Sequence, residues 1–308
     1  MDAKKIEGVL CPVVTPFKAD LSPDGVRFAA HCRWLLDQGC AGLAIFGTTS
    51  EANSLSVDER ITLFDDLLRR GIPAERLLPG TGCCALSDSV RLTRHFVAAG
   101  VAGVLMLPPF YYKGVSDEGL YRNYAQIVER VGDARLRVYL YHIPAMTQVP
   151  LSLTLIDRLL TAYPGAIAGI KDSSGDPAQL KALLETFAGR DFAVFPGSEV
   201  LLLQGLRGGG VGCITATGNV NPAAIADVCR HWREPDADAR QARLDALRKT
   251  IQAFPLIPAV KATIAHYADD LPWCSVRPPL VELDASQRSS LATQLTALGF
   301  SMPGLPIS

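Results

Sequence analysis

Short apolar runs rich in β-branched residues alternate with longer amphipathic segments along the chain as far as Asn221. Each run is bounded by glycine, proline or small polar residues, a pattern typical of strands that are buried on both faces. Eight runs are expected to be strands: Val9–Thr15, Gly42–Gly47, Leu77–Thr81, Gly103–Pro108, Arg137–Ile143, Ala166–Lys171, Ala193–Pro196 and Val211–Ala216.

The amphipathic segments between these runs predict helices. Ser56 with Glu59 three residues later forms a capping box, and Asp176-Pro177 is a second helix start. Glycines stand where several of the helices should end. The expected helices are Val26–Gln38, Val57–Arg70, Ser87–Ala99, Glu118–Val131, Leu151–Ala162, Ala178–Phe187 and Val200–Arg207.

Strands that alternate with helices pair in parallel, because each return to the sheet needs a crossover helix. Eight such units predict an α/β fold, the (β/α)8 TIM barrel, which is typically ~250 residues long. The alternative is an open, doubly wound sheet. That fold usually carries a glycine-rich fingerprint in its first turn, and the sequence CPVVTPFKAD there has none.

After Asn221 the strand pattern ends and only helical segments follow, separated by prolines. We therefore expect a catalytic barrel over residues 1–225 and a C-terminal helical domain over residues 226–308. The helices expected there are Pro222–Arg233, Ala237–Phe254, Ile257–Ala268 and Ser286–Leu298.

Composition narrows the functional classes. With a net charge of -1, the chain lacks the excess of positive charge expected of a protein that binds nucleic acid or an anionic membrane. No segment approaches the ~18 apolar residues of a membrane span, and the opening MDAKKIEG has no apolar stretch behind it that would make a secretory signal. The eight cysteines form no CxxC pair and no zinc spacing, so we expect reduced thiols, no metal site and a cytoplasmic protein.

One candidate reactive group stands at the end of the sixth predicted strand, in the stretch AIAGIKDSSGD. Lys171 follows a buried apolar run, and burial disfavours the charged form of an amine. A neutral amine beside a cavity suits Schiff-base chemistry on a carbonyl compound. The structural alternative is a lysine that extends to solvent at the strand end or pairs with Asp172.

Other polar residues share the same end of the predicted barrel, where the active sites of this fold lie. Tyr141 ends the fifth strand, and Gly47-Thr48-Thr49 ends the second. An amine, a phenol and a hydroxyl-bearing turn can form an imine, move protons and hold a carboxylate. Taken singly, the turn could be an ordinary βα connection and Tyr141 a core aromatic. His142 is interpreted as a packed, hydrogen-bonded residue.

Three spaced motifs resemble the signatures of the dihydrodipicolinate synthase / N-acetylneuraminate lyase family: Gly47-Thr48-Thr49-Ser50-Glu51, Tyr141-x-x-Pro144 and Gly169-Ile170-Lys171-Asp172. The resemblance implies class I aldolase chemistry on pyruvate or another 2-oxo acid, with no cofactor beyond the imine. It implies that Lys171 forms the Schiff base, that Tyr141 and Thr48 relay protons, and that Thr49 holds the pyruvate carboxylate.

The same resemblance implies further site residues and an assembly. In synthase members a tyrosine from a neighbouring subunit completes the relay, and Tyr111 fits that position best, with Tyr112 as a rival. The backbone carbonyl of Ile214 would face the site. Ser198 and Glu199 fill the loop in which family members vary with their second substrate, and we expect Gly197 and Glu199 to bind substrate. Family members are commonly homotetramers built as dimers of dimers.

Three positions depart from the family pattern. Ser50 replaces a glycine, a mild change that leaves both threonines. Met146 stands where the synthases have an arginine for the carboxylate of aspartate semialdehyde. This loses a contact worth roughly 1.5–3 kcal/mol. Ala216 replaces a sugar-contacting serine of the neuraminate lyases.

We therefore expect a lyase that joins pyruvate and an aldehyde or cleaves the corresponding 2-keto-3-deoxy acid, and the neutral Met146 suggests a sugar-derived acid. Three alternatives stay open. They are 4-hydroxy-tetrahydrodipicolinate synthase proper, a 2-keto-3-deoxy sugar acid dehydratase and a non-catalytic binder of 2-oxo acids.

Overall fold

The computed structural model describes residues 6–305. Within that range all strand pairings between named strands are parallel, in two runs with the orders β2-β1-β7 and β3-β4-β5-β6. The strands are β1 Gly8–Cys11, β2 Gly42–Leu43, β3 Val104–Met106, β4 Val138–His142, β5 Ile167–Asp172, β6 Ala193–Pro196 and β7 Gly212–Ile214.

Two connections join these runs into a ring. Residues 77–81 lie between β2 and β3, where the amide of Leu78 donates to the carbonyl of Leu43 at 2.9 Å and the amide of Leu105 donates to that of Pro79 at 2.9 Å. On the other side the amide of Val211 donates to the carbonyl of Val194 in β6 at 3.2 Å. The predicted eight-stranded barrel is confirmed, with residues 77–81 in the place of the third strand. Pro79 has no N–H, so this segment forms isolated bridges instead of a regular ladder.

Most strands are shorter than the apolar runs that predicted them, and the first two lose the most at their carboxyl ends. The first ends at Cys11, immediately before Pro12, which cannot donate to a ladder. The second ends at Leu43, and Phe46 then adopts a φ of 59°, in the left-handed region that ends an extended strand. Both strands therefore end in irregular backbone on the side where they lead into the helices.

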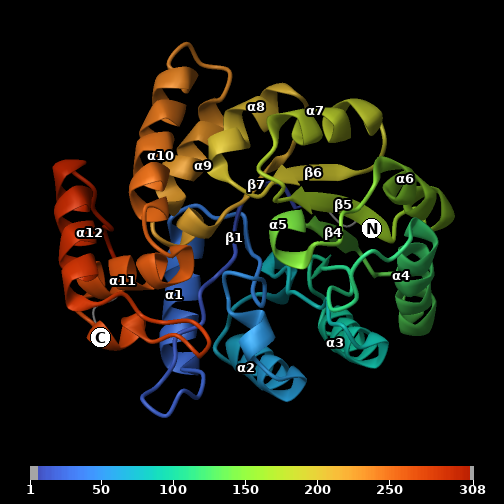
Figure 1. Ribbon diagram of the computed structural model, residues 1–308, viewed down its shortest axis with the longest axis horizontal. Coiled ribbons are helices and arrows are strands. Elements are labelled where there is room, and N and C mark those ends of the chain that lie inside the picture. Colours follow the sequence, from blue (N-terminus) through green and yellow to red (C-terminus); the bar gives the residue numbers. More distant parts are fainter. Residues whose placement is uncertain (1–5, 306–308) are drawn as a thin grey trace.

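Helices surround the strands on the outside of the ring (Figure 1). Ser56 and Glu59 form the predicted capping box of α2, and Asp176 caps α7. A short helix that the sequence pattern did not predict, α5 (Pro144–Thr147), follows β4. The barrel helices are α1 Gly25–Asp37, α2 Val57–Arg69, α3 Leu86–Ala98, α4 Asp117–Val131, α6 Leu153–Ala162, α7 Pro177–Thr186, α8 Leu202–Arg207 and α9 Pro222–His231.

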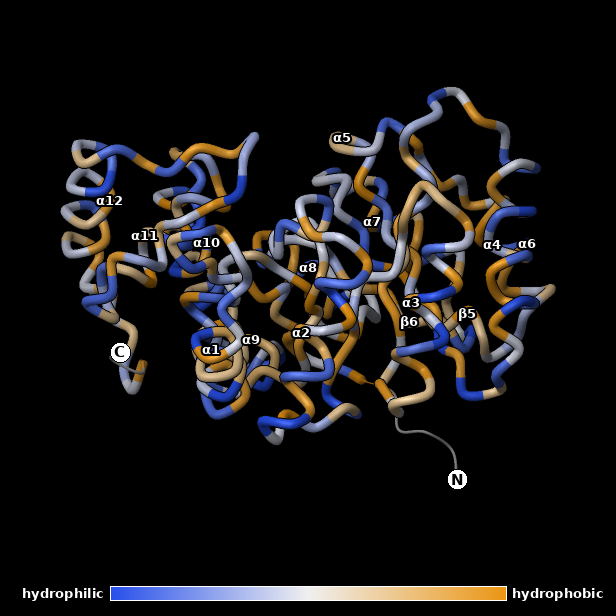
Figure 2. Tube along the Cα trace, turned by 90° about the horizontal axis from the view of Figure 1, so that it is seen from below, coloured by the Kyte–Doolittle hydropathy of each residue, from blue (hydrophilic) through white to orange (hydrophobic). Residues whose placement is uncertain are grey.

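The C-terminal helices α10 (Ala237–Gln252), α11 (Leu256–Ala268) and α12 (Ala285–Ala297) lie together at one end of the molecule, beside the barrel (Figures 1 and 2). Residue 225, the predicted domain boundary, falls inside α9. The two-domain division stays a prediction, and residues 1–5 and 306–308 of it lie outside the described residues. No helix within residues 6–305 is long and apolar enough to cross a bilayer.

Alternation along the strands divides the core into two clusters. In β4, Tyr139 and Tyr141 pack in the cluster that fills the barrel interior, whereas Val138 and Leu140 pack in the larger cluster between strands and helices. Successive side chains of a strand point to opposite faces. Tyr141 is therefore directed into the barrel at its carboxyl end, and His142 is directed away from it.

Candidate active site

The centre of the site is a short chain of polar groups on β4 and β5. Tyr141 lies opposite Lys171 in the parallel register of these strands. The Nζ atom of Lys171 donates to the Oη atom of Tyr141 at 3.2 Å, and the Tyr141 hydroxyl donates to Oγ1 of Thr48 at 3.3 Å. Lys171 and Tyr141 are each 3% exposed. The amine is thus held in a poorly solvated position against a phenol, as the sequence predicted.

The environment of Tyr141 changes its acidity. Burial by itself raises the pKa of the Tyr141 hydroxyl, but the charge of Lys171 and hydrogen bonds involving Thr48, Lys171 and Ser173 lower it by more. The net result is a pKa below the ordinary value of a tyrosine. A phenol that loses its proton more readily is better suited to accept and return protons during a reaction.

The turn that carries Thr48 and Thr49 is fixed by close backbone packing. A side-chain carbon on Gly80 would lie only 2.0 Å from the carbonyl oxygen of Phe46, so only glycine fits at that position. Ser50, where the family pattern has glycine, is fully buried and accepts a hydrogen bond from the amide of Gly47 at 3.2 Å. The serine therefore closes the turn internally and leaves both threonines facing the site.

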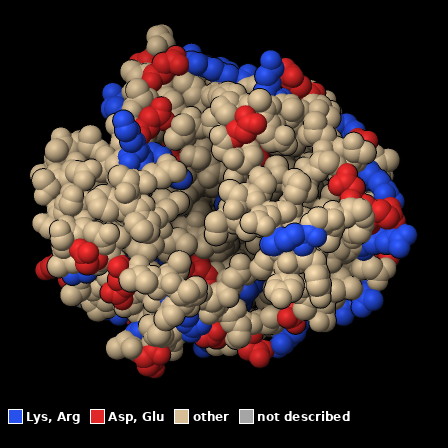
Figure 3. All heavy atoms as spheres, viewed as in Figure 1, with Lys and Arg blue, Asp and Glu red and all other residues tan. Residues whose placement is uncertain are grey.

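A cavity of about 770 Å³ opens at this end of the barrel. Five of the predicted site residues line it: Thr48, Thr49, Tyr141, Lys171 and Gly197. The face of the molecule that carries α5 is hollowed near its centre (Figure 3). The cavity is large enough for a bound keto acid together with a second substrate.

The structure places three other predicted residues outside this lining. Ile214 is fully buried in β7. Glu199 is 2% exposed, and its carboxylate accepts hydrogen bonds from Thr215 and Thr217 and pairs with Arg248. Tyr111 is 74% exposed on the loop after β3. The roles of these residues stay predictions.

Tyr112, the rival of Tyr111, is equally exposed, and the two rings meet edge to face with centroids 5.4 Å apart. Exposure and position therefore do not separate the two tyrosines. The expectation that Tyr111, and not Tyr112, completes the relay also stays a prediction.

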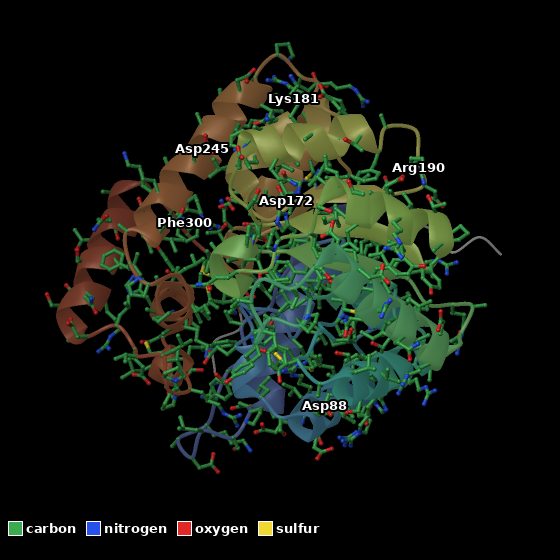
Figure 4. The ribbon with its side chains drawn as sticks, turned by 45° about the vertical axis from the view of Figure 1, so that its right-hand side comes forward. Asp88, Asp172, Lys181, Arg190, Asp245 and Phe300 are labelled. Carbon is green, nitrogen blue, oxygen red and sulfur yellow. The ribbon has the colours of Figure 1, made fainter. Side chains whose placement is uncertain are left out.

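His142 and Asp172 form a separate buried pair on the outer side of the strands. Their Nδ1 and Oδ1 atoms are 3.1 Å apart, and Asp172 also accepts from the amide and hydroxyl of Ser174. Asp172 lies near the middle of the molecule in Figure 4. His142 is thus packed and hydrogen-bonded, as predicted, and Asp172 is engaged by His142 and Ser174 while Lys171 contacts Tyr141.

Sequence reasoning missed several lining residues from the C-terminal part of the chain. Arg248 and Gln252 of α10, residues 255–258 and residues 279–281 all line the cavity. The sequence signal was the group of prolines, which we interpreted only as helix breaks. Within residues 6–305, no group of three or more His, Cys, Asp or Glu residues is placed to hold a metal ion.

Comparisons with known proteins agree with this geometry. The sequence matches the model of the Dihydrodipicolinate synthetase family over residues 5–298. A relative from Chloroflexus aurantiacus, named "Uncharacterized DapA-like lyase", is 35% identical over 287 residues, which cover 92% of this chain and 94% of the relative.

Two solved structures are similar over almost the whole chain. Dihydrodipicolinate synthase from Agrobacterium tumefaciens str. C58 has a TM-score of 0.88 and 31% identity, covering 94% of this chain and 99% of that one. YagE from E. coli K12, a prophage protein of the dihydrodipicolinic acid synthase family solved in complex with pyruvate, has a TM-score of 0.86 and 29% identity, covering 96% and 99%.

Fold, site and relatives together define a carbon–carbon lyase of the class I aldolase type. The chain belongs to the dihydrodipicolinate synthase / N-acetylneuraminate lyase family, as the three motifs predicted.

Proposed function

We propose that the protein forms an imine between Lys171 and pyruvate and uses it to make or break a carbon–carbon bond to an aldehyde. The observation that carries this proposal is the chain Lys171–Tyr141–Thr48, with contacts of 3.2 and 3.3 Å, at the base of the 770 Å³ cavity. The nucleophile, a proton carrier and a second hydroxyl are in hydrogen-bond reach of one another, as covalent catalysis requires.

In the condensation direction, the Lys171 amine adds to C2 of pyruvate and one water leaves; the resulting imine takes a proton from Tyr141 and becomes the protonated imine. Tyr141, backed by Thr48, removes a proton from the C3 methyl group to give the enamine. The enamine C3 attacks the aldehyde carbon, the aldehyde oxygen takes the proton that Tyr141 removed from C3, and the protonated imine forms again. Water then hydrolyses the imine, which releases a 4-hydroxy-2-oxo acid and restores the amine. Cleavage follows the same steps in reverse.

Substrate contacts complete the proposal. Thr49 holds the pyruvate carboxylate, and Gly197 presents its backbone to the cavity at a point where a side chain would lie 1.9 Å from Oγ of Ser173. The backbone carbonyl of Ile214 faces the site, and Glu199 binds the second substrate from the loop after β6. The reaction needs no metal or bound cofactor, since the imine supplies the electron sink. YagE, a member of the same family, was solved with pyruvate.

The cellular context is proposed by similarity to the family. The protein acts in the cytoplasm as a homotetramer, a dimer of dimers in which Tyr111 of one subunit completes the relay of another. Its partners are small molecules, with no nucleic acid and no membrane.

Borohydride reduction in the presence of pyruvate, followed by peptide mass analysis, tests the proposal. We expect an adduct on the peptide that contains Lys171, and Lys171→Ala should lose both the adduct and turnover. Lys181→Ala is the matched control, because Lys181 is 69% exposed on α7 and does not line the cavity. Figure 4 shows it near the top of the view, above Asp172. If the adduct persists in Lys171→Ala as it does in the control, the proposal is contradicted.

A product assay separates the remaining alternatives. Release of pyruvate and an aldehyde from a 4-hydroxy-2-oxo acid supports the lyase, whereas loss of water alone supports the dehydratase. An adduct on Lys171 without turnover of any aldehyde or keto acid supports a binder. Efficient use of aspartate semialdehyde would instead identify 4-hydroxy-tetrahydrodipicolinate synthase proper.

A further inference from the structure

Apolar side chains form a wall along part of the cavity lining. These include Met146 after β4, Val200 after β6, Leu256 and Ile257 at the start of α11, and Leu280 and Val281 before α12. Four segments that are far apart in the sequence contribute to this wall. A wall assembled from so many segments is a property of the site as a whole and cannot be attributed to one local pattern.

Three of these side chains are exposed to an extent that is unusual for large apolar residues. Met146 is 66% exposed, Val200 is 44% exposed and Val281 is 78% exposed. Apolar surface that gathers at the mouth of a cavity typically marks a binding site for an apolar group. In Figure 3 most of the residues beside the central hollow carry no charge.

The charges in the described lining are already compensated. Besides Lys171, the charged residues of the described lining are Asp172, which is engaged by His142 and Ser174, and Arg248, whose side chain is 8% exposed. Its Nη1 atom lies 3.2 Å from Oε2 of Glu199 and 3.2 Å from Oγ1 of Thr215. A guanidinium held in this way offers little attraction to a carboxylate at the far end of a substrate.

The wall formed by residues 279–281 is anchored to the barrel. Nη1 of Arg277 donates to the carbonyl of Ser54 at 2.6 Å and to Oε2 of Glu59 at 3.0 Å. The backbone amide of Arg277 donates to Oε2 of Glu51 at 2.8 Å. Leu280 and Val281 follow three and four residues later, and the amide of Leu280 donates to the carbonyl of Arg277 at 3.1 Å, which holds this segment at the cavity.

We propose that the aldehyde half of the substrate carries an apolar substituent, an alkyl or aryl group, that lies between Met146, Leu256 and Val281. This inference rests on the proposed function and specifies its second substrate. A polyhydroxylated chain would lose hydrogen bonds to water where it lies against these apolar side chains, and none of the three offers a hydrogen-bond partner in return. The sugar-derived aldehyde that Met146 alone suggested is thereby replaced by an apolar one, for which the rest of the wall is complementary.

Condensation of pyruvate with matched aldehydes tests the inference. Propanal and glyceraldehyde have the same carbon skeleton and differ by two hydroxyl groups, and pentanal and benzaldehyde extend the apolar part. We expect kcat/KM for propanal to exceed that for glyceraldehyde by about 10–100-fold, and to rise by about tenfold more for pentanal or benzaldehyde. An equal or higher value for glyceraldehyde, or no gain with apolar size, would overturn the inference.

Substitutions in the apolar wall test whether its side chains cause the preference for apolar aldehydes. Met146→Gln and Val281→Gln should each lower kcat/KM for pentanal by about 5–10-fold while pyruvate is still trapped on Lys171. Val26→Gln is the matched control, because Val26 is 62% exposed on α1 and does not line the cavity. Equal losses in all three variants, or none in the two wall variants, would overturn the inference.

The outcome also separates this inference from the proposed function. If pyruvate is not trapped on Lys171, the proposed function itself fails. If pyruvate is trapped but glyceraldehyde is preferred, or none of the four aldehydes is consumed, only the apolar acceptor is wrong.

Discussion

The side-chain amine of Lys261 in α11 is paired with the carboxylate of Glu51 in the turn after β2, and both side chains are completely buried. The two residues are 210 positions apart in the sequence. Lys261 also donates to the carbonyl of Ser275 at 2.6 Å. Glu51 follows Thr48 and Thr49 with a φ of 56°, so this pair ties the catalytic turn to the C-terminal helices.

Lys261→Met should therefore lower the free energy of unfolding by about 3–5 kcal/mol, because it leaves the Glu51 carboxylate buried without its partner. Glu51→Gln combined with Lys261→Met should recover much of that loss. Lys181→Met is the matched control, since Lys181 pairs with Glu185 at 3.7 Å with both side chains more than half exposed. It should change stability by less than about 0.5 kcal/mol in a denaturant titration. Equal effects of the two single substitutions would contradict the role of the buried pair.

Tyr141→Phe should slow turnover by roughly 10²–10⁴-fold, the range for loss of an acid–base group, while pyruvate is still trapped by borohydride. Tyr139→Phe is a close control, because Tyr139 is also buried in the barrel interior on β4 but contacts the ring of Phe195. It should leave kcat nearly unchanged. Full activity of Tyr141→Phe in a steady-state assay would remove this tyrosine from the mechanism.

The two threonines of the turn should affect different kinetic constants. Thr48 contacts Tyr141, so Thr48→Val should lower kcat by about 10–10²-fold with little change in KM for pyruvate. Thr49 is proposed to hold the pyruvate carboxylate, so Thr49→Val should raise KM for pyruvate by about tenfold, as expected for a lost hydrogen bond to a charged group. Steady-state kinetics with pyruvate varied would distinguish the two, and a reversed pattern would exchange their roles.

Acid stability should depend on the pair between Glu59 and Arg277. The hydrogen bond from Arg277 lowers the pKa of Glu59 to about 2, against the opposing effect of burial. Between about pH 4.5 and 2 the unfolded chain then binds more protons than the folded one, so the stability from this pair is complete above pH 4.5 and is lost as the pH falls toward 2.

Glu59→Gln should therefore lower the free energy of unfolding by about 1–2 kcal/mol at pH 6, a value reduced for the partial exposure of the carboxylate. The difference from wild type should shrink toward zero near pH 2.5. Denaturant titrations at several pH values measure this, with Glu185→Gln, on the exposed surface of α7, as the control. A difference that does not change with pH would contradict the assignment.

Tyr111 should matter for turnover only in the assembled protein. If a neighbouring subunit supplies this hydroxyl, Tyr111→Phe should lower kcat by about 10–10²-fold, whereas Tyr112→Phe should have little effect. Light scattering on the same samples would report whether the tetramer persists. A dilute monomer with full specific activity would show that no subunit completes the site of another.

Local sequence was sufficient for much of the fold and for the centre of the site. Period-two alternation in β4 already implied that Tyr141 shares the interior face with Tyr139, and parallel pairing brought Lys171 beside it. The strand limits were less predictable. Their ends depend on single backbone features, such as the left-handed φ of Phe46 and the missing N–H of Pro79, which apolar patterning does not report.

The sequence by itself determined the barrel and the position of Lys171, Tyr141 and Thr48 at one end of it, because these follow from short-range periodicity and from the order of strands and helices. The family followed from the resemblance carried by three spaced motifs. Only the tertiary structure decided the apolar wall of the cavity and the burial of Lys261 against Glu51. Both require segments near residues 255 and 280 to dock over a turn near residue 50. Contacts over such separations depend on how whole elements pack, and no local pattern in the chain encodes them.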